Sequence, residues 1–147
     1  MKNSHIHPTP QAGFTLLEVL IALLVLSIGL LGLAGLQVQG LKYNHDAYVR
    51  SQGTYLAYDM FERMRLNAAN AASYVGGKPL AGCGGAGSLA ENDRACWFED
   101  LEGLLPGGDA TITTDGGTPA QYTLTITWTD RFSGDTITQS WTSVIAP

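Results

Sequence analysis

Glu18 is the only charged residue in a long apolar stretch that begins at Phe14. A carboxylate inside a bilayer costs a few kcal/mol, so an intramembrane acid usually has a partner and a function. No lysine or arginine lies between Lys2 and Lys42, so the stretch itself supplies no cation. Cleavage after Gly13 would create one, because the new amino terminus at Phe14 would lie about one helical turn from Glu18. The alternative is a glutamate that reaches the lipid headgroups at the membrane edge.

Two cysteines form a second candidate site. Cys83 and Cys96 are the only cysteines, and the residues between them are polar or rich in glycine. In an exported domain such a pair predicts a disulfide, which would close a loop of about 14 residues and contribute roughly 3 kcal/mol. The alternative is a metal site, but two thiols with no nearby histidine make a poor zinc site.

The remaining residues offer little for catalysis. His5 and His7 are one residue apart and could bind a metal, but in a short polar leader we expect both to be solvated. A nucleophile and base set would have to combine His45 with a cysteine that is expected to be oxidised. The acids from Glu91 to Glu102 are expected to form a solvated face. We therefore expect no enzyme, no catalytic residue, no metal and no cofactor.

The element that positions Glu18 is the apolar run from Phe14 to Leu36, about 23 residues long. As a helix it would reach roughly 34 Å, enough to cross the hydrocarbon core of a bilayer. The run is longer than the apolar region of a secretory signal, although a small-residue cleavage site could be read near Ala34. Three glycines recur in it at every third position: they could allow close helix packing, form a weak segment, or simply follow membrane-helix composition. They are Gly29, Gly32 and Gly35.

The sequence around the possible cleavage site resembles a known signal. Gly13-Phe14-Thr15-Leu16-Leu17-Glu18-Val19-Leu20-Ile21-Ala22 is similar to the class III signal of type IV pilins and type II secretion pseudopilins. The resemblance implies cleavage after Gly13 by a prepilin peptidase, N-methylation of Phe14, and insertion of the helix into a filament. In that family the glutamate pairs with the terminal amine of a neighbouring subunit, and Glu18 occupies the matching position.

Charge and length suggest the domain organisation. The net charge is −5 and the pI about 4.9, which argues against a general nucleic-acid binder. Lys2 favours a cytoplasmic N-terminus and places most of the chain outside the inner membrane. We expect a leader peptide over residues 1–13, a transmembrane and filament-core helix over 14–40, and one periplasmic globular domain over 41–147.

The helix is expected to continue to about Asn67. Four apolar residues fall on one helical face and predict an amphipathic half that covers a sheet: Val49, Leu56, Met60 and Met64. His45 lies where this helix would leave the membrane and is expected to be exposed. Residues 67–87 are rich in alanine, asparagine and glycine and predict a loop.

The rest of the chain predicts a short helix and a sheet. The helix is expected from Asp93 to Leu105, where proline and glycine end it. A first strand is expected over 110–114, and a second over 122–129 with alternating apolar and threonine residues. After a turn over 130–135, a third strand would place Ile137, Trp141 and Ile145 on one face. The predicted fold class is α+β, a long N-terminal helix on a small antiparallel sheet, which resembles the architecture of type IV pilins.

Three later segments resemble the PilV type of minor pilin: the cysteine loop, residues 96–108, and the strand 122–128. This resemblance implies a low-copy subunit that joins other minor pilins and the major pilin, helps to start pilus assembly, and sits in a tip complex that could carry an adhesin. Two alternatives stay open. One is a minor pseudopilin of a type II secretion system, and the other is an anchored module that binds an adhesin, a surface or DNA.

Overall fold

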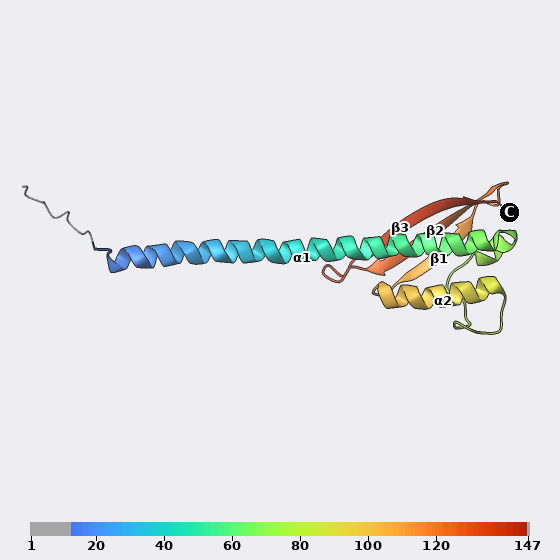
Figure 1. Ribbon diagram of the computed structural model, residues 1–147, viewed down its shortest axis with the longest axis horizontal. Helices are drawn as coiled ribbons and strands as arrows, with labels where there is room; N and C mark the ends of the chain where they lie inside the picture. The colour runs from blue at the N-terminus through green and yellow to red at the C-terminus, as the bar shows by residue number, and fades with distance from the viewer. Residues whose placement is uncertain (1–12, 147) are drawn as a thin grey trace, which may run out of the picture. The chain divides into compact units, whose positions relative to one another are not determined.

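The structure, a computed structural model, describes residues 13–146 (Figure 1). The predictions for Lys2, His5 and His7 lie outside the described residues. The chain divides after Leu41 into two compact units, and each is described by itself. The elements follow in the order α1 (Leu16–Leu66), the 3₁₀ helix η1 (Ala68–Tyr74), α2 (Leu89–Leu104), β1 (Asp109–Thr114), β2 (Ala120–Thr129) and β3 (Thr136–Ile145).

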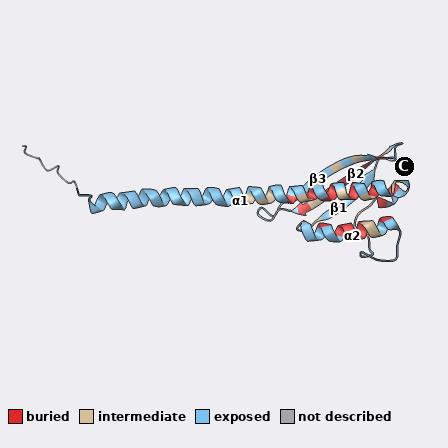
Figure 2. Ribbon diagram, viewed as in Figure 1, coloured by how far each residue is buried: buried red, intermediate tan, exposed pale blue. Residues whose placement is uncertain are grey.

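The first unit holds the apolar part of α1. Every residue from 13 to 41 is exposed, including all of its leucines, isoleucines and valines (Figure 2). By length and composition α1 is able to cross a membrane. A helix that is apolar on all sides requires a lipid or protein environment around it, because water disfavours so much apolar surface.

The second unit contains a three-stranded antiparallel sheet in the order β1-β2-β3. The central strand sets the register, with Leu124 opposite Ile112 on one side and opposite Trp141 on the other. On β2 the residues Tyr122, Leu124, Ile126 and Trp128 are all buried, as their period of two predicts. The predicted α+β fold class is therefore confirmed, as a long apolar N-terminal helix with a small antiparallel sheet.

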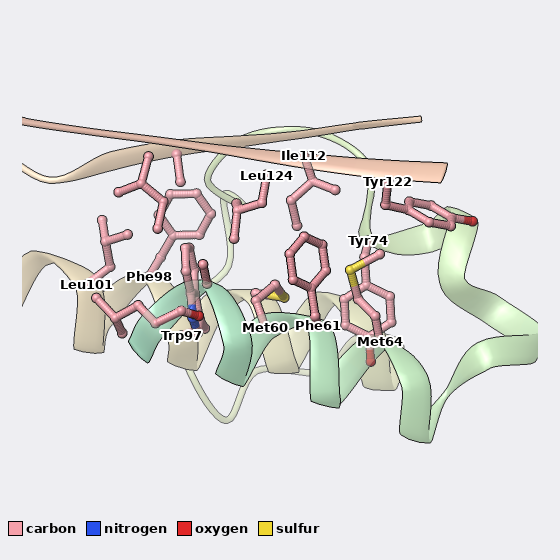
Figure 3. Packing of buried hydrophobic residues seen from close by; sticks show 14 of the residues in the cluster. Met60, Phe61, Met64, Tyr74, Trp97, Phe98, Leu101, Ile112, Tyr122 and Leu124 are labelled. Carbon is pink, nitrogen blue, oxygen red and sulfur yellow. The ribbon is translucent and has the colours of Figure 1, made fainter. Parts of the chain in front are cut away.

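The core of this unit lies between the inner face of the sheet, the second half of α1, and α2 (Figure 3). The predicted face of α1 is confirmed, since Val49, Leu56, Met60 and Met64 are all buried. Gly53 lies on the same face, where an added Cβ would be 3.5 Å from the Trp128 ring. A glycine at this position lets the helix approach the sheet closely.

Two of the predicted boundaries are wrong. Residues 67–87 are not all loop, because η1 covers Ala68–Tyr74 and buries the Tyr74 ring in the core. The short helix begins at Leu89, four residues before Asp93. Ser88 starts it early through a capping box: the Ser88 hydroxyl accepts from the Glu91 amide at 3.2 Å, and the Glu91 carboxylate accepts from the Ser88 amide at 3.0 Å.

His45 is also not the exposed residue that we expected. It is half-buried, and its ring meets the Phe132 ring edge-on with centroids 5.5 Å apart. The Lys42 ammonium lies 5.4 Å from the centroid of the same Phe132 ring. The predicted turn after β2 is confirmed: the Gly134 amide donates to the Asp130 carbonyl at 2.9 Å, and Gly134 adopts a φ of +76°. This turn brings Phe132 to the start of the unit.

Candidate assembly site at the start of the apolar helix

Thr15 caps the first turn of α1. Its hydroxyl accepts a hydrogen bond from the Glu18 amide at 3.2 Å, and its carbonyl accepts from the same amide at 3.1 Å. The Thr-x-x-Glu spacing would allow a full capping box, in which the Glu18 carboxylate reaches back to the Thr15 amide. Within the described residues only the threonine half is formed. The carboxylate is therefore not used in capping this helix.

Phe14 and Glu18 lie on the same side of the helix start. They line one apolar groove of about 380 Å³, together with Val19, Ala22, Leu23 and Leu26. The spacing of four residues explains this, since such residues stack on one helical face. Among residues 13–146 no ion pair involves Glu18. The positive end of the helix dipole favours a carboxylate here, but a full cation has to come from elsewhere.

Gly13 precedes the helix and is exposed. A Cβ added at this position would meet no atom of the described residues within 4 Å. No packing contact within residues 13–146 explains a glycine at position 13.

The second predicted site is a closed disulfide. Cys83 and Cys96 are joined, with Cα atoms 4.4 Å apart, as the sequence led us to expect. The segment before α2 is held to that helix at further points: the Cys83 amide donates to Glu99 Oε1 at 3.0 Å, and the Gly84 amide donates to Asn92 Oδ1 at 2.7 Å. An ion pair between Lys78 and Glu102 joins the same two segments.

Metal binding by the cysteines has no support in this geometry, because both sulfurs are used in the disulfide. Across the part of the chain that the structure describes, there is no group of three or more histidine, cysteine, aspartate or glutamate side chains that could hold a metal.

Among the acids from Glu91 to Glu102, Glu91, Glu99, Asp100 and Glu102 are exposed as predicted, and Asp93 is the exception. Asp93 is half-buried and accepts a hydrogen bond from the Tyr74 hydroxyl at 2.5 Å. Burial, reinforced by this bond to Asp93, raises the pKa of Tyr74 to about 12. Glu91, Glu99 and Glu102 are exposed, but each has a defined partner in the capping box or in the preceding loop. Glu99 and Glu102 thus join the preceding loop to α2.

Arg94 is a structural residue that the sequence analysis missed. It is buried, and its guanidinium donates to the backbone carbonyl oxygens of Gly77 and Val75. Burial lowers the pKa of Arg94, and the charge of Glu91 partly opposes this. A signal was present in the sequence, because Arg94 lies three residues before Trp97 and so falls on the helical face that enters the core.

The comparisons with known proteins point to the N-terminal site. The family described as the prokaryotic N-terminal methylation motif matches residues 9–34, which include Gly13, Phe14 and Glu18. A search of the curated proteins and a search of the solved structures each found no match. The motif is a prepilin-like signal, and together with the long apolar α1 it supports a membrane-anchored protein of the type IV pilin kind.

Proposed function

We propose that this protein is a minor pilin that helps to initiate and assemble type IV pili through the first half of α1. A prepilin peptidase cuts after Gly13, and the new amino group of Phe14 is methylated. The leader is residues 1–13, the membrane and filament-core helix is residues 14–40, and the globular domain, residues 41–147, lies in the periplasm of an inner-membrane protein until the subunit joins a pilus at the cell surface.

One observation carries this proposal: Phe14 and Glu18 line the same groove, and the Glu18 carboxylate has no cation among the described residues. In a filament the methylated amine of a neighbouring subunit supplies that cation. Burying a carboxylate in an apolar environment is strongly unfavourable unless a positive charge accompanies it. A subunit in the wrong register would leave Glu18 unpaired, so the pair selects one axial position for each helix.

The exposed apolar side chains of residues 16–41 provide the contacts that hold the subunits together, and the ion pair of Glu18 sets their axial position. When these side chains move from the lipid into a filament core, they pack against the equivalent helices of other subunits and keep an apolar environment. The partners in this proposal are the prepilin peptidase, the major pilin, and other minor pilins in a tip complex of the PilV type that could hold an adhesin. The role is structural and involves no catalytic step. The N-terminal motif equally suits a minor pseudopilin of a type II secretion system, which would use Glu18 in the same way.

The decisive experiment removes the charge of the Glu18 side chain and keeps its shape. Glu18→Gln should leave membrane insertion intact and reduce recovery of the subunit in sheared filaments by at least about tenfold, since about 1.4 kcal/mol already corresponds to that factor. Asp100→Asn is the matched control, because Asp100 is an exposed acid on α2. Equal recovery of wild type and Glu18→Gln in the filaments would contradict the assembly role.

A further inference from the structure

The two edges of the sheet differ in how they are covered. On β1 the outer edge is already bridged: the Gly76 amide donates to the Ile112 carbonyl at 2.9 Å, and the Ile112 amide donates to the Gly76 carbonyl at 3.0 Å. On β3, which runs from Thr136 to Ile145, no hydrogen bond joins the outer side of the backbone to any other element within the described residues. An uncovered edge is a template for another strand.

The ladder identifies which backbone groups of β3 point outward. Gln121 accepts from the Asp115 amide on the β1 side of the sheet, so the odd-numbered residues of β2 turn their backbone groups toward β1. The even-numbered residues, such as Leu124, therefore bond to β3, where the register pairs Leu124 with Trp141. This leaves outward N–H and C=O groups on the even-numbered residues of β3: Thr136, Thr138, Ser140, Thr142 and Val144. The same rule turns Ile112 outward on β1, where Gly76 pairs with it.

The edge of β3 also lacks the features that usually prevent pairing. Natural edge strands are short, bent by a bulge, or protected by charged residues and proline. β3 is ten residues long and pairs with β2 in unbroken register, and it contains no charged residue, proline or glycine. The side chains of its outward-facing residues are all exposed.

A groove lies beside this edge, on the inner face of the sheet. It has a volume of about 140 Å³ and is lined by Trp141, Thr142 and Ser143 of β3 and by Ala57, Tyr58, Phe61 and Arg65 of α1. Arg65 closes one side, since its guanidinium donates to the Ser143 hydroxyl at 2.7 Å. Side chains alternate along a strand, so a strand added to β3 would direct every second side chain toward α1 and one of them into this groove. The aromatic lining favours a large apolar side chain.

We propose that β3 receives an extended strand from a different polypeptide of the assembly, which bonds to the outward groups of Thr138 to Val144 and places an apolar side chain beside Trp141 and Tyr58. This inference rests on the proposed function, because it names how a neighbouring subunit would bind the globular domain. The residues of the partner strand that pair with β3 are uncharged, because β3 contains no charged residue to balance one. The Arg65 guanidinium beside the groove already has Glu62 and Ser143 as partners. Backbone bonds supply the affinity and the groove supplies the specificity.

Hydrogen exchange tests the pairing directly. Full-length protein purified alone in detergent is compared, by mass spectrometry, with the same protein in sheared filaments and in native membranes. Pairing should slow exchange of the outward amides, so that residues 136–145 take up about four fewer deuterons at short times in the assembled samples. Equal exchange in all samples would overturn the proposal.

Two variants establish the cause of the protection. Ser140→Pro removes one outward N–H and leaves the bonds to β2 in place, because proline is tolerated on an edge strand when its nitrogen faces outward. Thr142→Lys places a charge on the edge and does not depend on the backbone effect of proline. Both should abolish the extra protection. Ser140→Ala is the matched control: it removes only the hydroxyl that bonds to Thr125 and keeps the N–H, so the protection should persist.

The remaining outcomes separate this inference from the proposed function. If Glu18→Gln is lost from filaments but β3 exchanges equally fast in every sample, the strand proposal fails and the assembly role stands. If β3 is protected in membranes while wild type and Glu18→Gln are recovered equally, the assembly role fails and strand pairing stands. If protection rises with the concentration of the purified protein alone, a second copy of this chain pairs with the β3 edge. That result would overturn the proposal that a different polypeptide does so.

Discussion

The indole Nε1 of Trp97 donates a hydrogen bond to the backbone carbonyl of Leu56 at 2.9 Å, across 41 residues of sequence. Both side chains are fully buried, and the bond joins α2 to α1 at the centre of the core. The Trp97 ring also meets the Phe98 ring edge-on, at 5.3 Å between centroids. A large aromatic residue with its one polar atom satisfied thus fixes the position of α2.

Replacing Trp97 with phenylalanine should therefore destabilise the globular unit. The change removes the bond to Leu56 and leaves a cavity, and together these should lower the free energy of unfolding by about 2–4 kcal/mol. Denaturant unfolding followed by circular dichroism measures the loss. Phe98→Leu is a control that creates a cavity without breaking a hydrogen bond, and it should cost less. Equal losses in the two variants would show that the bond contributes nothing.

Gly13 is expected to matter for processing only. Gly13→Leu should leave the precursor uncut, although a Cβ at position 13 would meet no atom of residues 13–146 within 4 Å. Mass spectrometry of the membrane fraction should find chains that retain the leader. Gly103→Leu is the matched control, because Gly103 is also surrounded by open space and should allow normal cleavage. A Gly13→Leu chain that still begins at Phe14 would disprove cleavage at this site.

Reduction of the disulfide should weaken the globular unit. The bond between Cys83 and Cys96 closes a loop of about 14 residues, for which the chain-entropy estimate is roughly 3 kcal/mol. The loop would still be held through Glu99 and Asn92, so we expect a folded protein with a lower unfolding midpoint. The double variant Cys83→Ser/Cys96→Ser should behave like the reduced wild type. Two free thiols in exported wild-type protein would contradict a disulfide in the native molecule.

Tyr74 should make stability depend on alkaline pH. Its pKa is raised to about 12, above its ordinary value of 10.0, mainly because the ring is buried. The folded protein thus holds the phenol proton where the unfolded chain releases it, so its contribution to stability is complete below about pH 10 and is lost as the pH rises toward about 12. Unfolding midpoints measured across this range should fall. In Tyr74→Phe the decline should be shallower, and an equally steep decline would exclude Tyr74 as its source.

Much of the architecture could be predicted from local patterns. Tyr122, Leu124, Ile126 and Trp128 alternate with threonines, and a period of two allows only one face of a strand to enter a core. The spacing of Leu56, Met60 and Met64 likewise assigns one side of α1 to the sheet. The start of α2 could also be predicted in principle, because Ser88 and Glu91 have the capping-box spacing. The glycines just before Ser88 favour a loop and so obscure this signal.

The sequence by itself determined the candidate assembly site, because Phe14 and Glu18 are close in the chain, at the start of one helix. The cost of the Glu18 charge depends on the apolar environment of that helix and does not depend on contacts with distant parts of the chain. Only the tertiary structure decided the roles of Tyr74, Asp93 and Arg94, whose environments arise from contacts between distant segments. The tertiary structure also decided that Gly76 pairs with the outer edge of β1, whereas the outer edge of β3 has no partner within the described residues. Strand order and the pairing of edges both depend on contacts between distant segments. Hydrophobic periodicity shows which face of a helix or strand is buried, but it does not show which other element packs against that face.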